Sequence, residues 1–274
     1  MTTLPFSAKS LFDLTGRAAV VTGGGGALGS YICAGLAQSG ASVAVVDLRL
    51  ENAARVAAEI EAAGGKSIGI GADVSREAEV ASLFAEVDRA FGAVDILVNS
   101  VSAAVERKAP EEVTLEAWQH MLDSNLTSYF LCSQAAGRRM IAAGRGGSIV
   151  NISSIGGVTA LGRGAMSYGV AKAGVVQLTR ETCFAWAHHK IRVNAILPCQ
   201  FTNAWWAERQ ADPASRALVS RVLDGIPLGR LGDAQEIVGP VLFLASEAAS
   251  MVTGAILPVD GGNLAMNAGG SIEW

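Results

Sequence analysis

The residues of this chain whose types and spacing best suggest chemistry are a tyrosine and a lysine four positions apart, Tyr168 and Lys172. Both fall in a segment whose pattern predicts a helix over 166–187, and a spacing of four places two side chains on one helix face. A phenol beside a fixed ammonium can donate or accept a proton near neutral pH. Ser154, fourteen residues before the tyrosine, adds a hydroxyl that can hold a substrate oxygen against the phenol.

The effect of the lysine charge on the pKa of the tyrosine can be expressed as a free energy. Lowering the pKa of a free tyrosine by about two units takes roughly 2.7 kcal/mol. An ammonium at about 4 Å supplies on the order of 4 kcal/mol at an effective dielectric of about 20, before desolvation is subtracted. We therefore expect Lys172 to lower the pKa of Tyr168. The alternative is a chance pair, with the tyrosine packed at a helix border and the lysine in solvent.

A glycine-rich segment near the start of the chain argues against a chance pairing of Tyr168 and Lys172. Residues 22–29 read Thr-Gly-Gly-Gly-Gly-Ala-Leu-Gly and lie between a predicted strand over 18–22 and a predicted helix over 28–38. Glycines let the backbone approach a pyrophosphate, and a helix N-terminus presents free N–H groups to it. A glycine turn alone is weak evidence, but this position predicts a dinucleotide site. The residues expected to contact the dinucleotide here are Gly23, Gly25, Gly26, Leu28 and Gly29.

The second predicted strand, over 42–47, ends in a carboxylate. Asp47 can accept hydrogen bonds from both adenosine ribose hydroxyls and repels a 2′-phosphate. The glycine turn has no basic residue, because Gly26 stands where an arginine or lysine could bind that phosphate. Arg49 is the nearest cation, and we interpret it as a solvated residue at a helix start. The sequence therefore predicts NAD rather than NADP.

Two further strand ends carry polar residues. Asp73 and Val74 follow the third predicted strand and are expected to hold the adenine edge. The alternative for Asp73 is capping the next helix, a role that Ser75 can also fill. Asn99 follows the fourth strand and is expected to brace the loop beside the adenosine, the alternative being an ordinary turn residue.

Strands and helices alternate along the chain, which is typical of a parallel sheet covered on both faces. We predict an α/β fold in one domain over 1–274, a Rossmann-type doubly wound sheet of seven parallel strands. The predicted strands are 18–22, 42–47, 67–71, 94–98, 148–152, 191–196 and 255–259. The predicted helices are 28–38, 51–63, 76–91, 115–143 and 166–187.

Residues 203–226 interrupt this alternation and contain Trp205 and Trp206. An insertion after the carboxyl end of a strand lies over the ligand crevice of such a sheet. We therefore expect a small, mobile helical lid whose tryptophans form part of the substrate wall. Packing of the two tryptophans in a subunit interface is the alternative.

Composition narrows the class of protein. A hydrophobic fraction of 50% and a charged fraction of 17% indicate a large core, and the net charge of −4 argues against nucleic acid or an anionic membrane as partner. The chain begins without the features of a signal peptide, and no apolar run approaches ~20 residues, so we expect a soluble, cytoplasmic protein. Four cysteines without paired spacing and three histidines without suitable neighbours predict neither a disulfide framework nor a metal site.

Over residues 14–262 the chain resembles the short-chain dehydrogenase/reductases. The resemblance is carried by the glycine turn, Asp73, Asn99, Asn-Ile-Ser-Ser at 151–154, the Tyr168–Lys172 pair, Ile-Arg-Val-Asn-Ala-Ile at 191–196 and Val-Asp-Gly-Gly at 259–262. It implies a homotetramer or dimer and hydride transfer between a nicotinamide coenzyme and an alcohol or carbonyl. It implies that Tyr168 is the acid/base, that Ser154 polarises the substrate oxygen and that Lys172 binds the nicotinamide ribose. Asn125 would break its helix locally and hold a water for proton relay.

The chain departs from the family pattern mainly at the nicotinamide and substrate end. Ala27 replaces the second glycine of the turn, and Asn-Ser-Val-Ser at 99–102 replaces Asn-Asn-Ala-Gly. Cys199 follows Pro198 in place of a glycine, and Asn203 stands at the usual threonine near the nicotinamide carboxamide. Pro198 and Asn203 are still expected to contact the coenzyme, so the departures bear on the substrate more than on the chemistry.

The predicted function is an NAD-dependent dehydrogenase of a secondary alcohol, such as a sugar, polyol or sugar acid. One alternative is an NADPH-dependent 3-oxoacyl-type ketoreductase, which would favour a basic docking patch for an acidic carrier. Another is a non-catalytic sensor that binds the coenzyme, and members of that kind usually lose the tyrosine or the lysine. Ser154, Trp205 and Trp206 are the residues expected to contact the substrate.

Overall fold

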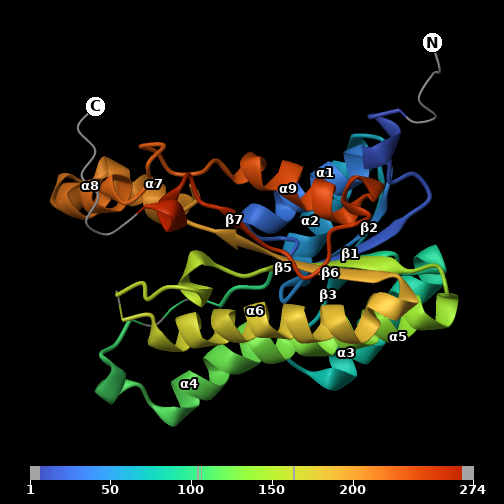
Figure 1. The fold of residues 1–274 in the computed structure, drawn as a ribbon, viewed down its shortest axis with the longest axis horizontal. Helices are drawn as coiled ribbons and strands as arrows, with labels where there is room; N and C mark the ends of the chain where they lie inside the picture. Colours follow the sequence, from blue (N-terminus) through green and yellow to red (C-terminus); the bar gives the residue numbers. More distant parts are fainter. Residues whose placement is uncertain (1–6, 104, 106, 163, 267–274) are drawn as a thin grey trace.

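Seven parallel strands form one sheet in the order β3-β2-β1-β4-β5-β6-β7 (Figure 1). The computed structural model describes residues 7–103, 105, 107–162 and 164–266. The predicted fold class is confirmed. The strands are β1 Ala18–Thr22, β2 Ser42–Asp47, β3 Lys66–Gly71, β4 Ile96–Asn99, β5 Gly147–Ile152, β6 Ile191–Pro198 and β7 Ile256–Val259.

Helices cover both faces of the sheet. Apart from two helices after β6, the α-helices are α1 Ala27–Gln38, α2 Leu50–Ala62, α3 Glu77–Phe91, α4 Leu115–Leu122, α5 Ser128–Ala143, α6 Met166–Trp186 and α9 Val238–Ala245. Helices α1, α2 and α9 lie on one face, and α3, α5 and α6 lie on the other (Figure 1). Because both faces are covered, strands such as β1 are buried at every position and apolar without alternation.

The strand order places the ligand crevice. Strand β1 pairs with β2 on one side and with β4 on the other, so the chain reverses its direction of winding there. In open α/β sheets ligands bind at this reversal, outside the carboxyl ends of the strands. Asp47, Asn99, Ile152 and Pro198 are the last residues of β2, β4, β5 and β6.

The single helix predicted over 115–143 is two helices. Helices α4 and α5 are separated by η3, a π-helical turn over Asp123–Thr127 that contains Asn125. The local break expected at Asn125 is thus confirmed. Such turns widen the helix by one residue and often occur at functional sites.

The region after β6 contains the expected small helices. Helices α7 Ala204–Ala211 and α8 Arg216–Asp224 form the lid, whose mobility stays a prediction. Trp206 is buried there with Val222, Ile226 and Leu231. Sequence analysis assigned no element to the following segment, where the short turn η7 Ala234–Ile237 and then α9 pack against α1.

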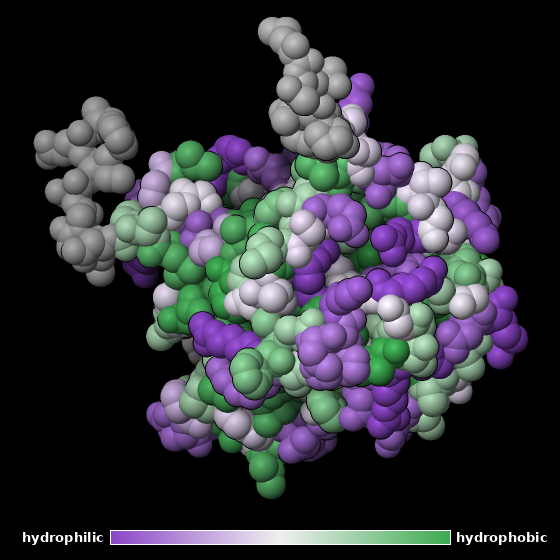
Figure 2. Space-filling model, turned by 45° about the vertical axis from the view of Figure 1, so that its right-hand side comes forward, coloured by the Kyte–Doolittle hydropathy of each residue, from purple (hydrophilic) through white to green (hydrophobic). Residues whose placement is uncertain are grey.

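On the face shown in Figure 2, hydrophilic and hydrophobic side chains are interspersed. Among the described residues, no helix combines the length and the apolar character needed to span a bilayer.

Candidate active site

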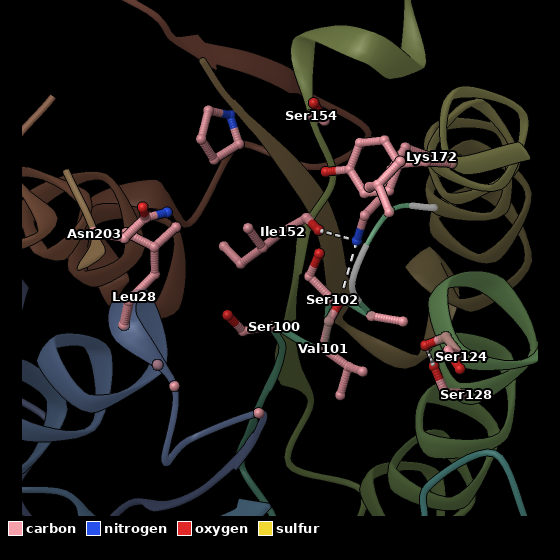
Figure 3. A pocket seen from close by; sticks show the side chains of 18 of the residues that line it. Leu28, Ser100, Val101, Ser102, Ser124, Ser128, Ile152, Ser154, Lys172 and Asn203 are labelled. Atoms are coloured by element: carbon pink, nitrogen blue, oxygen red, sulfur yellow. Dashed lines mark hydrogen bonds between the residues drawn. The ribbon is translucent and has the colours of Figure 1, made fainter. Parts of the chain in front are cut away.

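A cavity of about 840 Å³ follows the carboxyl ends of the strands, from the glycine turn to the lid. Figure 3 shows part of it, with side chains from the glycine turn, the strand ends, α6 and the lid. Gly25, Asn99 and Asn125 were predicted as site residues, but they do not line it. The predicted residues on its wall are Gly23, Gly26, Leu28, Gly29, Asp47, Asp73, Val74, Ser154, Tyr168, Lys172, Pro198, Asn203, Trp205 and Trp206.

The glycine turn leaves no room for side chains. Gly23 has φ +67°, and a Cβ there would lie 2.7 Å from the carbonyl oxygen of Ser100. A Cβ on Gly29 would collide with the carbonyl of Gly23. The N-cap of α1 is Gly26, so no side chain occupies the first N–H groups of this helix. This bare backbone cradle at a helix N-terminus fits the pyrophosphate of a dinucleotide.

At the end of β2, the Asp47 carboxylate is held through one oxygen. The backbone N–H of Arg49 donates to Oδ1 of Asp47 at 3.1 Å, whereas among the described residues nothing donates to Oδ2. The guanidinium of Arg49 faces the Asn52 amide, which accepts two hydrogen bonds of 3.1 and 3.2 Å when its oxygen is turned toward it. Gly25 lies behind this arrangement, because a Cβ there would meet Asp47 and Asn52. The free oxygen of Asp47 suits ribose hydroxyls.

The Asp73 side chain, which was predicted to hold the adenine edge, forms hydrogen bonds within the protein. Oδ1 of Asp73 accepts from the Ser75 backbone N–H at 3.0 Å and from its hydroxyl at 2.6 Å, while Oδ2 pairs with Arg76. Burial would raise the pKa of Asp73, but the hydrogen bonds from Ser75 and the charge of Arg76 lower it. The Asp73 side chain thus forms the turn before α3 but does not cap this helix, whose N-cap is Arg76 without a side-chain hydrogen bond. Asp73 and Val74 also line the cavity.

Asn99 lies behind the cavity wall. Its Nδ2 donates to Oδ1 of Asn151 at 2.9 Å and to the Ser133 hydroxyl at 3.1 Å. These bonds tie the end of β4 to β5 and α5, and bracing of the following loop by Asn99 stays a prediction. The Asn99 side chain therefore does not face the coenzyme cavity.

Tyr168 and Lys172 lie together on α6, with the Lys172 Nζ 5.8 Å from the Tyr168 ring centroid. Burial raises the pKa of Tyr168, and hydrogen bonds to Ser154 and Ser102 act in the opposite direction. In the coenzyme-free protein, Lys172 by itself therefore does not lower the phenol's pKa as we expected. From the sequence, Ser102 was considered only as a replacement for the glycine of the family pattern. A hydroxyl just after the end of a strand was nevertheless a signal for a site residue.

The Lys172 ammonium is buried and held by three protein oxygens. Its Nζ donates to the carbonyl oxygens of Val101 at 3.2 Å and Ile152 at 3.1 Å (Figure 3), and to the Tyr129 hydroxyl at 2.9 Å. The Tyr129 hydroxyl lies 2.9 and 2.8 Å from the same two carbonyls. Burial lowers the pKa of Lys172 to about 7. Sequence analysis missed Tyr129, because an aromatic residue in an apolar helix reads as core.

Asn125 is fully buried one turn before Tyr129. Its Nδ2 donates to the Met121 carbonyl oxygen at 3.2 Å. Its Oδ1 accepts no hydrogen bond from any described residue. The π-helical turn thus leaves Oδ1 of Asn125 buried and unpaired among the described residues. The water-holding role of Asn125 stays a prediction.

The lid end of the cavity is formed by Asn203, the two tryptophans and residues of the loop after β4. The Oδ1 of Asn203 accepts from the Trp206 backbone N–H at 3.0 Å and so caps α7. Arg107 and His120 also line this end, and sequence analysis proposed neither as a site residue. Among the described residues, no group of three potential ligands could hold a metal ion.

Known proteins resemble this chain over almost its whole length. The family model described as enoyl-(acyl carrier protein) reductase matches residues 25–263. The D-threitol dehydrogenase of Mycolicibacterium smegmatis is 38% identical over 92% of this chain and 94% of its own length. The 2-dehydro-3-deoxy-D-gluconate 5-dehydrogenase of Escherichia coli is 35% identical over 93% of this chain and 98% of its own.

A solved structure agrees with these relatives. A short-chain type dehydrogenase/reductase from Mycobacterium marinum is 34% identical, with a TM-score of 0.86 over 94% of this chain and 99% of that one. Sequence, fold and the geometry of the cavity thus agree. The chain belongs to the short-chain dehydrogenase/reductase family, as an oxidoreductase of alcohol groups that uses a nicotinamide coenzyme.

Proposed function

We propose that this protein is an NAD-dependent dehydrogenase that oxidises a secondary alcohol in a sugar, polyol or sugar acid. The observation that carries the proposal is the convergence of Tyr168, Ser154 and Lys172 on one cavity with the bare glycine turn and Asp47. The two relatives named above act on a polyol and on a sugar acid, which supports this substrate range.

The preference for NAD rests on Asp47. Its free Oδ2 can accept from ribose hydroxyls, and its charge repels a 2′-phosphate. Arg49 is turned toward Asn52, which supports its interpretation as a residue of the helix start rather than a phosphate ligand. The bound coenzyme would accept the hydride. Pro198 and Asn203 would line its nicotinamide end.

The chain's own residues supply orientation and proton transfer. Ser154 and Tyr168 would hold the substrate hydroxyl between them, and the Tyr168 phenolate would take its proton. With the oxidised coenzyme bound, the charges of Lys172 and of the nicotinamide ring would together favour that phenolate. Three protein oxygens fix the position of the Lys172 ammonium. Onward release of the proton through Lys172 and a water held by Asn125 is part of the proposal.

The direct test replaces Tyr168 by phenylalanine. We expect Tyr168→Phe to lower kcat by at least about 100-fold, because the acid/base group is lost while the ring remains. Binding of NADH, followed by fluorescence, should stay within a few-fold of the wild type. Turnover retained in this variant on polyols and aldonates would contradict the assignment.

Coenzyme preference is tested separately. Wild-type kcat/KM for NAD should exceed that for NADP by at least about 10-fold, since a 2′-phosphate would face the Asp47 carboxylate. Replacing Asp47 by alanine should narrow this ratio. A wild-type preference for NADP would overturn the assignment and favour the ketoreductase alternative.

We also propose that the chain is one domain and assembles as a homotetramer or dimer in the cytoplasm. All seven strands belong to one sheet, which supports a single domain. All four cysteines are free thiols, as is usual in a reducing compartment.

A further inference from the structure

An arginine of the loop after β4 stands at the substrate end of the cavity and has no anionic partner among the residues that the structure describes. Arg107 lines the cavity, and its guanidinium carbon lies 5.2 Å from the Trp205 ring centroid. No described residue forms an ion pair or hydrogen bond with its guanidinium. The five N–H donors of this group are therefore available to a ligand.

The backbone at Arg107 and Lys108 lies against the segment that precedes the catalytic helix. The N–H of Lys108 donates to the carbonyl of Gly164 at 3.3 Å. Gly164 has φ +67°, and a Cβ there would lie 3.2 Å from the carbonyl carbon of Arg107. Because Gly164 is four residues before Tyr168, Arg107 is anchored beside the start of α6.

The lid fixes the other side of the guanidinium. Trp206 is buried in the lid, and its ring meets that of Trp205 edge-on, with centroids 4.7 Å apart. Trp205 is thus held in place by a buried neighbour and presents its ring to Arg107. Cation–π contact orients a guanidinium at little entropic cost and leaves its planar edge free for a bidentate partner.

Charge along the cavity changes sign from one end to the other. Asp47 and Asp73 line the coenzyme end, whereas Arg107 and Lys172 line the end near the lid and α6. The three protein oxygens around Lys172 already use its N–H donors. Among the described residues that line the cavity, Arg107 is therefore the cation that an anionic group of the substrate can reach with unused donors.

We propose that Arg107 binds a carboxylate of the substrate, so that the substrate is a hydroxy acid. This inference rests on the proposed dehydrogenase function and selects among the substrates it allows. The alcohol to be oxidised lies at Tyr168 and Ser154, and the carboxylate lies between Arg107 and the lid. Paired N–H donors of a guanidinium match the two oxygens of a carboxylate, and a neutral polyol leaves that match unused.

The experiment compares aldonates with the alditols of the same carbon chain, from four to six carbons, for example D-gluconate with D-glucitol. Wild-type kcat/KM with NAD should be at least about 10-fold higher for the best aldonate than for its alditol. Arg107→Gln should lower kcat/KM for the aldonate by roughly 10- to 100-fold, the worth of a charge-assisted pair, and change the alditol by less than about threefold. Arg107→Lys should recover part of the aldonate activity.

Arg209 provides the matched control. Its guanidinium also lies over Trp205, 3.4 Å from the ring centroid, but Arg209 does not line the cavity. Arg209→Gln should leave the ratio of aldonate to alditol activity unchanged. An equal loss on both substrates in Arg107→Gln, or a loss of the ratio in Arg209→Gln, would overturn the carboxylate site.

The two proposals fail in different ways. Oxidation of alditols but not of aldonates by the wild type would end the carboxylate proposal and leave the dehydrogenase standing. Oxidation of neither class would count against the dehydrogenase proposal. Calorimetry of D-gluconate with the protein–NADH complex then tests the carboxylate site directly. Binding that Arg107→Gln weakens at least 10-fold would support the site. No binding would overturn it.

Discussion

The Lys172 ammonium is buried and lines the same cavity as Tyr168. Its three hydrogen-bond acceptors are the Tyr129 hydroxyl and the carbonyls of Val101 and Ile152, which come from separate elements. At Tyr168, burial raises the pKa of the phenol more than its two serine hydrogen bonds lower it. The charge states of both side chains therefore depend on the whole fold.

The buried ammonium makes the stability of the coenzyme-free protein depend on pH. Burial depresses the pKa of Lys172 from 10.5 to about 7. Below pH 7 the lysine is protonated in both states, and the folded protein carries the full cost of a buried charge. Above pH 7 the unfolded chain binds more protons, so the contribution of Lys172 to stability rises by up to about 1.4 kcal/mol per pH unit.

Replacing Lys172 by methionine should remove this slope. We expect urea unfolding between pH 7 and 9 to show wild-type stability rising relative to Lys172→Met by about 1 kcal/mol per pH unit. The difference between the two proteins isolates the lysine, because their buried cysteines titrate alike. Parallel curves across this range would contradict the depressed pKa of the lysine.

At the scale of elements, the apolar strands were the most predictable feature. Every predicted strand is present, because central parallel strands covered on both faces, such as β1 and β2, are mostly apolar. Helix α9 was missed because it is apolar on all sides and contains Gly239 and Pro240, which suggest a loop. Proline is tolerated there since its position lies in the first turn, where the N–H needs no partner.

The π-helical turn η3 sets the direction in which the Tyr129 side chain leaves its helix. A widened turn holds one extra residue, which rotates all later side chains by roughly 100° relative to a regular helix. Periodicity counted from α4 therefore assigns the residues of α5 to the wrong face. Asn125 indicated the break, but only the fold shows that the break brings Tyr129 to Lys172.

Two helical glycines allow a matched test of the coenzyme cradle. A Cβ on Gly29 in α1 would collide with the Gly23 carbonyl, whereas a Cβ on Gly239 in α9 would meet open space. Gly29→Ala should weaken NADH binding at least about 10-fold and cost roughly 1–3 kcal/mol of stability, because backbone must move. Gly239→Ala should leave NADH binding unchanged and add up to about 1 kcal/mol of helix stability. Unchanged coenzyme affinity in a folded Gly29→Ala would show that the turn does not hold the pyrophosphate.

For the whole molecule, exposed apolar side chains favour assembly. Phe130 on α5 and both Val170 and Phe184 on α6 are exposed, Phe184 to 88%. Helices α5 and α6 lie side by side on the outside of one layer (Figure 1). Burying one such phenylalanine against a second copy contributes roughly 1.5–3 kcal/mol, so the pair of helices suits an interface.

We expect light scattering to give the mass of a dimer or tetramer at micromolar concentration. Phe184→Glu should weaken the association at least about 10-fold, because a charge replaces an apolar side chain that a neighbouring subunit would bury. Tyr31→Glu, on α1 across the sheet, is the control and should leave the mass unchanged. Since Phe184 is almost fully exposed in the single chain, Phe184→Glu should not alter folding of the subunit. A wild-type protein that is monomeric, or a Phe184→Glu variant with unchanged mass, would place the interface elsewhere or exclude it.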